Sequence, residues 1–528
     1  MLRRRAPLLL TVPALATVGA VLLPLAYLVV RAAGADRDAW EVLDLDRTGP
    51  LVLDTGLLVA VVVFWAAAIG IPLAWLVVRT DLPGRAFWAV AAALPLVIPS
   101  YVAALVLLGA LGPRGLLQDL LEEPFGVERL PDIYGLPGAA VALTLSTYPY
   151  VFLLTAAALR DLDPSLEEAA RGLGHTRFAA FRRVTLPALR PSVAAGCLLV
   201  ALYVLSDFGA VSLMDYPALT RSIYLQYQAL FDREPAAILS LVLVCLAALV
   251  LVLESRFRRR ARYHRASPGA ARASAPVTLG HWRWPALAFC SLVVGVFLVL
   301  PIAVLAYWTW EAVPLDRPVE LPWDQALNSV LASAVAAGIA AVAVLPVAFL
   351  SQRHPAPWTR VLERASFTAN ALPGIVIALS LVFFGARYGG ILYQTLAMLV
   401  FAYVVRFLPQ ALAATGAALR TVDPRVEEAA RGLGRGQLSV LVRVTVPLIR
   451  PGLLAGAALV FLSAMKELPA TLLLRPIGFD TLATEIWTAT SVAAYTEAAP
   501  AALLLIAVSA PFVYLLAARR GAATGSVD

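Results

Sequence analysis

Charged residues are scarce in this chain of 528 residues. They make up 14% of the sequence, whereas hydrophobic residues make up 61%. This balance excludes an ordinary soluble globular protein, in which about a quarter of the residues are charged. Lys466 is the only lysine, and no Gly-x-x-x-x-Gly-Lys-Ser/Thr phosphate loop occurs. The chain therefore cannot supply an ATP site of that type itself.

Cysteine and histidine are rare as well. The three cysteines, Cys197, Cys245 and Cys290, fall in apolar stretches at unrelated spacings, so we expect packing residues and neither a disulfide framework nor a metal site. The four histidines lie in polar segments without a partner at ligand spacing. We assign no metal and no cofactor to this chain.

Long apolar runs take the place of charge. A run of about 20 apolar residues can cross a bilayer as a helix. Twelve such runs are expected, at residues 8–31, 52–78, 87–111, 137–159, 191–214, 237–254, 284–309, 327–350, 366–385, 391–418, 451–474 and 499–518. The sequence thus predicts an all-α, polytopic integral membrane protein with about twelve transmembrane helices.

The basic residues indicate how these helices are oriented. Cytoplasmic loops carry an excess of Lys and Arg, and 30 of the 42 such residues lie in the termini and in the loops on the amino-terminal side. We therefore expect both termini to be cytoplasmic. The net charge of +8 is then explained by these retention signals and by contact with anionic membrane lipid, and not by nucleic-acid binding.

One polar sequence occurs twice. Residues 163–174 and 423–434 are identical at ten of twelve positions, and the match continues without a gap to Pro191 and Pro451. This duplication predicts two homologous six-helix halves with a pseudo-twofold axis along the membrane normal. We place the halves at 1–262 and 283–528, their repeated loops at 160–190 and 420–450, and a cytoplasmic linker at 263–282.

The duplication extends beyond the polar loops. Asp54-Thr55 resembles Asn328-Ser329, and we match Leu94-Pro95 with Leu372-Pro373. The basic run 256–265 leads into the linker, whose Ala, Ser and Pro content favours an exposed segment. We expect the basic run to be either a stop-transfer signal with a hinge between the halves or a regulatory or lipid-binding tract.

Each repeated loop predicts a short helix of about ten residues. Asp163 suits the N-cap, Pro164 the first turn and Gly174 the end of the first helix. The second copy repeats these signals from Asp423 to Gly434.

The faces of these short helices suggest a docking surface. Glu167 and Arg171 are four residues apart and can pair, while Leu166, Ala170 and Leu173 fall on one stripe. Either the segment is an ordinary amphipathic loop at the membrane surface, or it docks into a groove of a partner. Two near-identical copies favour docking, because solvated loops tolerate change more readily.

Both loops carry a recognisable motif. Glu167-Glu168-Ala169-Ala170 followed by Gly174, and Glu427-Glu428-Ala429-Ala430 followed by Gly434, resemble the EAA loops of permeases from binding-protein-dependent ATP-binding-cassette importers. The resemblance covers nearly the whole chain as a fused pair of permease domains. It implies a transport subunit, not an enzyme, in the bacterial cytoplasmic (inner) membrane. It also implies two partners: a cytoplasmic ATPase homodimer that binds ATP and Mg, and an extracytoplasmic substrate-binding protein.

Further stretches concern the cargo. Residues 94–102, 206–211, 466–476 and 478–483 resemble the fused permeases of ferric-iron importers. That resemblance implies ferric iron as the substrate. Fused permeases for thiamine and for phosphonates have a similar length and layout, so these two cargoes stay open.

Two carboxylates at membrane depth mark a candidate pathway. Asp207 and Glu467 occupy equivalent positions of the repeat and interrupt apolar runs. Such groups are costly in a bilayer and usually face the bundle interior, and oxygen ligands suit a hard cation. Alternatively, they pair with Arg or cap helix breaks at Gly209 and Pro469. The candidate pathway or gate residues are Pro99, Ser100, Tyr101, Ser206, Asp207, Lys466 and Glu467.

Two other protein classes fit less well. A secondary transporter driven by an ion gradient predicts charge pairs across several spans, whereas most spans here lack charge. A membrane-embedded enzyme predicts His, Cys or carboxylate groups at catalytic spacing, which the sequence does not contain.

Overall fold

The fold is entirely helical in the part of the chain that the structure describes. A computed structural model describes residues 7–113, 115–126, 130–162, 164–229, 234–261, 276–311 and 321–522. Within these ranges the regular elements are helices, apart from one isolated β-bridge between Thr80 and Val277. Twelve of the described helical segments are long and apolar enough to cross a membrane. The predicted all-α, polytopic fold is therefore confirmed.

The chain divides into two compact units, which we name after their central helices. The α3 unit comprises Asp44–Ser222, Cys245–Leu321 and Ile486–Asp528, and the α16 unit comprises Met1–Leu43, Ile223–Val244 and Pro322–Glu485. The α3 unit contains α3 (Leu45–Arg79), α4 (Arg85–Ala91), α5 (Ser100–Leu111), α6 (Leu116–Phe125), α7 (Leu136–Arg160), α8 (Pro164–Gly172), α9 (Arg177–Ala180), α10 (Leu186–Ser206), α11 (Gly209–Leu213), α14 (Arg283–Val294), α15 (Leu300–Glu311) and α25 (Tyr495–Ala522). The α16 unit contains α1 (Leu8–Ala33), α2 (Arg37–Trp40), α16 (Trp323–Arg353), α17 (Pro357–Ser366), α18 (Gly374–Phe384), α19 (Leu396–Thr421), α20 (Pro424–Gly432), α21 (Gln437–Val440), α22 (Val446–Met465) and α23 (Pro469–Leu474). Residues of both units form α12 (Leu219–Ala229), α13 (Glu234–Ala261) and α24 (Leu482–Ser491).

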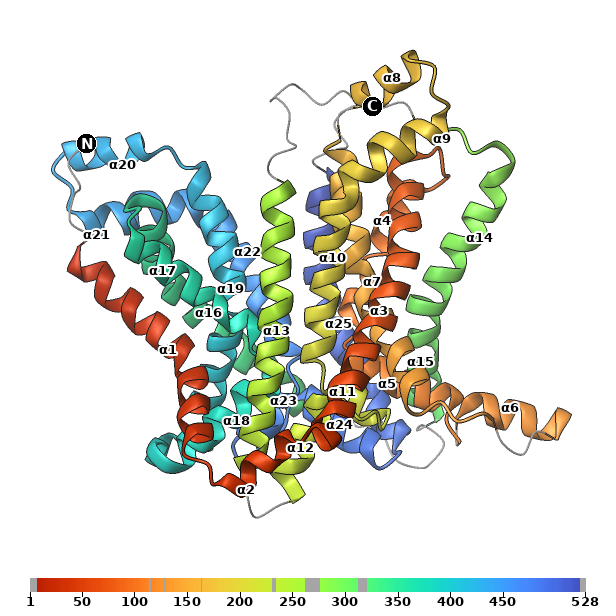
Figure 1. Cartoon of the computed structure of the whole chain (residues 1–528), viewed down its shortest axis with the longest axis horizontal. Helices are drawn as coiled ribbons and strands as arrows, with labels where there is room; N and C mark the ends of the chain where they lie inside the picture. Colours follow the sequence, from red (N-terminus) through yellow and green to blue (C-terminus); the bar gives the residue numbers. More distant parts are fainter. Residues whose placement is uncertain are drawn as a thin grey trace. The chain divides into compact units, whose positions relative to one another are not determined.

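Three closely packed helices form the centre of each unit. In the α3 unit these are α3, α7 and α10, which Figure 1 shows side by side. A Cβ at Gly70 would lie 2.9 Å from the Phe152 nitrogen, and one at Gly196 would lie 3.0 Å from the Val151 Cα. In the α16 unit, α16, α19 and α22 repeat the arrangement. Small residues at helix contacts suit a membrane, where close packing drives helix association.

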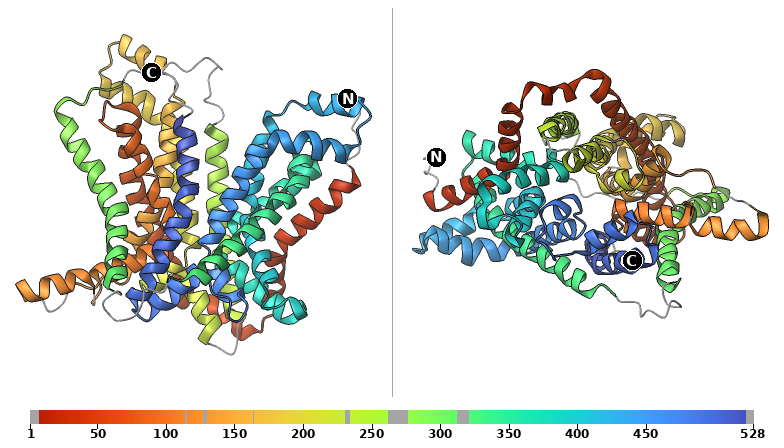
Figure 2. Two further views of the ribbon diagram at one scale, coloured as in Figure 1. Left: turned by 180° about the vertical axis from the view of Figure 1, so that it is seen from behind. Right: turned by 90° about the horizontal axis from the view of Figure 1, so that it is seen from below.

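Each unit also contains helices that come from the other sequence repeat. In the α16 unit, α1 packs on α16, α17 and α18, and in the α3 unit, α15 and α25 pack on α5 (Figure 2). The Tyr27 hydroxyl donates to the Phe383 carbonyl at 3.4 Å, and the Trp308 indole N–H donates to the Gly109 carbonyl at 3.1 Å. The compact units and the sequence repeats are thus different divisions of the chain, and the repeat boundaries stay a prediction.

Two of the predicted membrane runs are broken by proline-containing turns. After α4 a short 3₁₀-helix (Leu94–Val97) follows, and α5 begins directly after Pro99, as α18 begins directly after Pro373. Proline suits a helix start because its missing N–H is not needed there. The structural counterpart of Pro373 is therefore Pro99, and the match of Leu94-Pro95 with Leu372-Pro373 is wrong.

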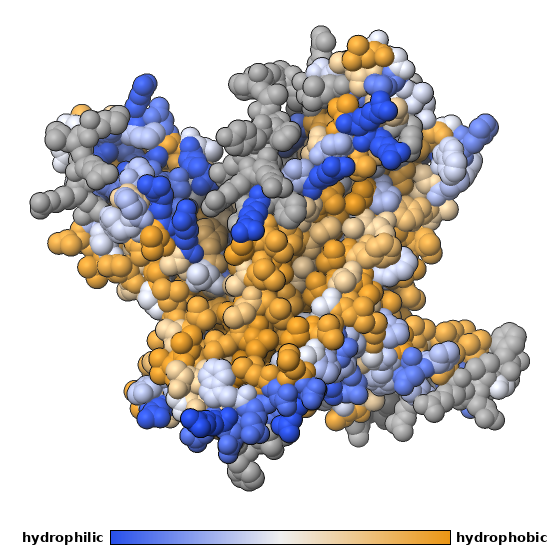
Figure 3. Space-filling view, viewed as in Figure 1, coloured by the Kyte–Doolittle hydropathy of each residue, from blue (hydrophilic) through white to orange (hydrophobic). Residues whose placement is uncertain are grey.

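The surface of the membrane helices is apolar. Large hydrophobic side chains such as Phe64 and Trp65 are exposed. Figure 3 shows that hydrophobic residues dominate along the long helices, while hydrophilic residues gather near the helix ends. This distribution is the one expected where lipid is the solvent for the helix sides.

Candidate coupling and membrane-depth sites

The two repeated loops form the predicted short helices, α8 and α20. The Asp423 side chain caps α20 by accepting from the Arg425 amide at 2.9 Å. The corresponding Asp163 lies outside the described residues. Gly174 and Gly434 follow the helices with φ of +87° and +81°, a conformation that favours glycine. The start of α20 and the ends of both helices are therefore as the sequence predicts.

The first glutamate of each motif turns toward the helical core of its unit. In the α3 unit, Glu167 pairs with Arg79 of α3 and accepts from the Thr185 hydroxyl at 3.3 Å. In the α16 unit, Glu427 pairs with Arg353 of α16 at 3.1 Å and accepts from the Thr445 hydroxyl at 3.2 Å. We call α8 and α20 the coupling helices, after their predicted role, and we call these two groups of three residues the coupling-helix anchors.

The anchors are shielded from solvent. The side chain of Glu427 is 2% exposed and that of Arg353 is 11% exposed, compared with 17% for Glu167 and 8% for Arg79. We expected Glu167 to pair with Arg171 on its own helix, but the structure pairs its carboxylate with Arg79, 88 residues earlier. In α20, Arg431 donates instead to the Glu427 backbone carbonyl at 3.3 Å.

The second glutamate of each motif points the other way. Glu168 and Glu428 are exposed, as are Ala169 and Ala429. Ala170 is buried and Ala430 is half-buried, so they face the remainder of their own unit. Gly172 and Gly432, Leu173 and Leu433, and Gly174 and Gly434 are exposed in both copies. The side chain of Leu166 lies outside the described residues, and the expected stripe is split because Ala170 faces inward while Leu173 faces outward.

A π-helical turn follows each coupling helix. These turns span Phe181–Thr185 and Leu441–Thr445 and lead directly into α10 and α22. Each turn ends with the buried threonine of the anchor. Single π-helical turns within α-helices are rare and occur frequently at functional sites.

At membrane depth, the α3 unit brings Ser100 and Asp207 together. The Ser100 hydroxyl donates to Asp207 Oδ2, while Asp207 Oδ1 accepts from the amides of Ala210 at 3.0 Å and Val211 at 3.4 Å. Asp207 ends α10 and caps α11. Of the other predicted pathway residues here, Pro99 precedes α5, Tyr101 is buried within it, and Ser206 is the last residue of α10.

The α16 unit treats the equivalent carboxylate differently. Glu467 accepts from Arg406 Nη1 at 2.7 Å and from the Ala470 amide at 3.2 Å, while Lys466 directly follows α22. Gly374 makes room for this ion pair, because a Cβ there would overlap the Arg406 guanidinium. Both carboxylates thus cap a helix break, which is one of the alternatives left open by the sequence. The described residues contain no group of three or more His, Cys, Asp or Glu that could hold a metal ion.

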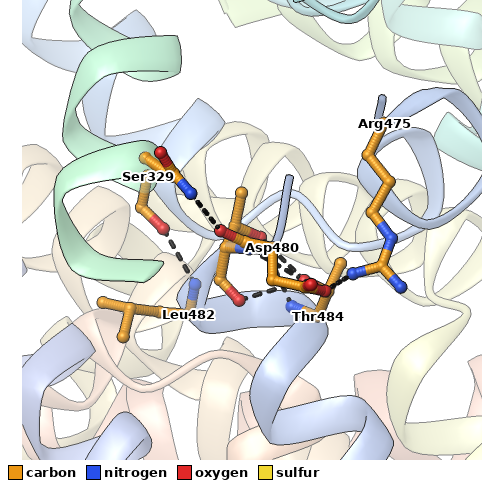
Figure 4. Close-up of polar contacts among 7 residues, drawn as sticks. Ser329, Arg475, Asp480, Leu482 and Thr484 are labelled. Carbon is orange, nitrogen blue, oxygen red and sulfur yellow. Dashed lines mark hydrogen bonds and ion pairs between the residues drawn. The ribbon is translucent and has the colours of Figure 1, made fainter. Parts of the chain in front are cut away.

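A further group of hydrogen bonds connects the segment that follows α11 or α23 to the start of the central helix of that unit, α3 or α16. We call each of these groups a polar junction. In the α16 unit, Asn328 donates to the Asp480 carbonyl at 2.9 Å and Ser329 accepts from the Leu482 amide at 2.9 Å (Figure 4). Arg475 forms an ion pair with the Asp480 side chain. The repeated Asp54-Thr55 and Asn328-Ser329 pairs were the sequence signal for this junction.

The α3 unit has a matching junction. Tyr216 donates to the Asp54 carbonyl at 2.8 Å, and Thr55 accepts from the Leu219 amide at 3.0 Å. Burial, with a smaller contribution from the nearby Asp54 carboxylate, raises the pKa of Tyr216 to about 12.

Comparison with known proteins adds a family assignment to this geometry. The family model described as binding-protein-dependent transport system inner membrane component matches twice, at residues 66–263 and 344–520. Each match includes one coupling helix and its π-helical turn. The predicted internal duplication of the sequence is therefore confirmed.

Individual relatives include proteins of one or both repeats. The Fe(3+)-transport system permease protein FbpB 2 of Haemophilus influenzae is 32% identical over 97% of this chain and 98% of its own length. The ferric transport system permease protein FbpB of Actinobacillus pleuropneumoniae is 24% identical over 75% of this chain and 60% of its own length. The molybdenum transport system permease protein ModB of Escherichia coli is 32% identical over 38% of this chain and 89% of its own length.

Proposed function

Because the chain belongs to the family of binding-protein-dependent transport system inner membrane components, we propose that it is the permease of an ATP-driven importer of ferric iron. The observation that carries the cargo is the match over nearly the full length of both chains to a permease named for Fe(3+) transport. The relative named for molybdenum transport matches only 38% of this chain. Thiamine and phosphonates are the competing cargoes.

We propose that α8 and α20 each dock into one subunit of a cytoplasmic ATPase homodimer. Their outward faces carry the same exposed residues in both copies, including Glu168 and Glu428, and the apolar Leu173 and Leu433 are 83% and 85% exposed. Exposed apolar side chains at the tip of a polar helix suit a protein interface. ATP and Mg bind to that ATPase, because the chain has no phosphate loop of its own.

The remaining partners follow from the same assignment. A substrate-binding protein delivers the cargo on the extracytoplasmic side. The chain then lies in the bacterial inner membrane with both termini in the cytoplasm, which is supported by the concentration of basic residues in the loops on that side. The candidate pathway residues, with Asp207 and Glu467 among them, would line or gate the route between the two sides.

Uptake of radiolabelled ferric iron tests the cargo. Cells that lack this chain are complemented with the native chain or with empty vector, and no other iron importer is active in the strain. Iron uptake that returns only with the native chain supports the proposal. If iron uptake is equal in both strains and thiamine or phosphonate uptake depends on the chain, the cargo is wrong.

Co-purification tests the docking surface. The variant Leu173→Asp with Leu433→Asp should insert into the membrane but fail to retain the ATPase, because charge would face an apolar groove. The variant Ile391→Asp changes a similarly exposed apolar residue in the 3₁₀-helix Gly390–Leu392, which is more than 30 residues from either coupling helix in the chain. Loss of the ATPase from the first variant alone supports docking through α8 and α20, and retention by both contradicts it.

A further inference from the structure

The two neighbouring glutamates of each coupling motif have separate tasks. Glu168 and Glu428 are exposed on the docking face. Glu167 and Glu427, one position earlier on the same helices, turn inward and are held by an arginine and a threonine of the permease core. The arrangement occurs independently in both units, so it is a property of the motif and not of one local environment.

We propose that Arg79 and Arg353 are positioning residues for energy coupling, a role that rests on the proposed function. Each arginine is at the carboxyl end of a central helix, α3 or α16. Through the glutamate it holds the coupling helix, and the glutamate also accepts from the threonine that directly precedes α10 or α22. Displacement of α8 or α20 by the ATPase is thereby delivered to two core helices together.

Chain connectivity alone would transmit such a movement poorly. A helix of nine residues such as α20 has little stability of its own, and a glycine with positive φ follows it as a natural hinge. A shielded ion pair resists reorientation, because separating the charges would leave each of them without compensation. The glycine alone would not fix the angle between the coupling helix and the core. The anchor fixes this angle.

The two anchors are braced by different neighbours. Arg353 also donates from Nη2 to the carbonyl of Val422, just before α20, at 2.9 Å. The end of α3 is instead paired with the predicted linker: the Val277 amide donates to the Arg79 carbonyl at 2.7 Å, and the Asp81 amide donates to the Val277 carbonyl at 3.2 Å. Both sets of hydrogen bonds hold the arginine or the end of its helix in place, although their partners differ between the two units.

Charge removal and charge exchange test the proposal in the full chain. Arg79→Gln and Arg353→Gln are each compared with Arg85→Gln and Arg360→Gln, which change exposed arginines six or seven residues further along. The readouts are chain inserted, ATPase co-purified, ATP hydrolysed and ferric iron taken up. We expect at least a tenfold fall in iron transported per ATP hydrolysed for the anchor variants, with the controls within twofold of the native chain.

The exchange Arg353→Glu with Glu427→Arg separates positioning from a direct contact of Glu427 with the ATPase. It should restore at least half of the native ratio, because the pair is re-formed with its charges reversed. It also decides the case in which a single variant fails to insert: recovery of both insertion and transport supports the proposal, and recovery of insertion alone overturns it.

Further outcomes are equally decisive. Anchor variants that transport as efficiently as their controls overturn the proposal while leaving the importer intact. If the native chain itself does not raise iron uptake, the proposed cargo fails instead, and the same ratio is measured with whichever of thiamine or phosphonate the native chain transports.

Discussion

The two units solve the same problem at membrane depth in different ways. In the α3 unit, Asp207 accepts from neutral donors that include the Ser100 hydroxyl and two backbone amides. In the α16 unit, Glu467 is paired with the guanidinium of Arg406. The coupling-helix anchors, by contrast, use the same three residue types in both units. At membrane depth both carboxylates cap a short helix. In the α16 unit the carboxylate is also paired with an arginine.

The capping carboxylate is shared by both units and is therefore a feature of the duplicated fold. The pairing with Arg406 is a feature of the α16 unit. A carboxylate that caps α11 or α23 stabilises the break that follows α10 or α22, so both units keep it. The Arg406 guanidinium occupies the space that a Cβ at residue 374 would take, so a side chain there would require the guanidinium to shift. The serine in the other unit fills the equivalent helix position and donates a hydrogen bond instead.

The largest effect is expected from Arg406→Ala. This change leaves Glu467 shielded and without its cation, which should lower the free energy of unfolding by about 3–5 kcal/mol. Thermal unfolding of the detergent-purified chain would show this as a lower midpoint. Arg387→Ala, which removes an exposed arginine of the same unit, serves as the control. Equal midpoints for the two variants would contradict a stabilising role for the ion pair.

Gly374→Ser would make the α16 unit resemble the α3 unit at one position. The new side chain should displace the Arg406 guanidinium and lower the free energy of unfolding by about 1–3 kcal/mol, as overpacking does elsewhere. A Cβ at Gly338 meets nothing within 4 Å, so Gly338→Ser is the matched control. A midpoint that is unchanged by Gly374→Ser would show that the guanidinium can move aside without loss.

Asp207→Asn should be milder than Glu467→Gln. Asparagine can still accept from the amides of Ala210 and Val211, so we expect a loss of about 1–2 kcal/mol from weaker hydrogen bonds. Glu467→Gln leaves the Arg406 charge uncompensated and should cost more. The two midpoints measured side by side test this ranking, and the reverse order would sink the contrast between the units.

The smallest effect concerns the polar junctions. Tyr216→Phe removes one hydrogen bond and should lower the free energy of unfolding by about 1 kcal/mol at neutral pH. Because the pKa of Tyr216 is raised to about 12 in the folded chain, compared with about 10 when unfolded, its contribution is complete below about pH 10. That contribution is lost as the pH rises from about 10 to about 12, because over this range the tyrosine ionises in the unfolded chain but stays protonated in the folded chain.

Denaturant unfolding at two pH values measures this loss. The stability difference between the native chain and Tyr216→Phe should shrink by about 1 kcal/mol between pH 9 and pH 11. Asn328→Leu removes the equivalent bond of the α16 unit without a titrating group, so its effect should not change over that range. A constant difference for Tyr216→Phe would mean that its hydroxyl is not protected by the fold.

Local signals predicted much of this molecule. Apolar length was sufficient for the twelve membrane helices. The repeated signals from Asp423 to Gly434 were sufficient for the coupling helices, because proline and glycine act within one turn of their own position. The helix breaks at Asp207 and Glu467 were also predictable from a local signal, because each carboxylate interrupts an apolar run.

Contacts between distant segments were not predictable in this way. The partner of Glu167 is 88 residues earlier in the chain, and pairing with Arg171 was the wrong prediction because sequence spacing favours neighbours on one helix. One signal was available: Arg79 and Arg353 occupy the same place relative to the repeated Asp54-Thr55 and Asn328-Ser329 pairs. The exchange of covering helices between repeats left no comparable trace, because lipid-facing and helix-facing surfaces are both apolar.

The exchange of helices between the repeats has a consequence for the synthesis and membrane insertion of the protein. The core of the α3 unit is complete in the nascent chain by Ser222, but its cover α25 begins only at Tyr495. At about 5–20 residues per second, the ribosome needs roughly 14–55 seconds to make the intervening segment. During that interval the face of α5 that receives α25 must be occupied by lipid or by an insertion factor. Among the described helices, the one synthesised last therefore packs on a helix that is made near the start of the chain.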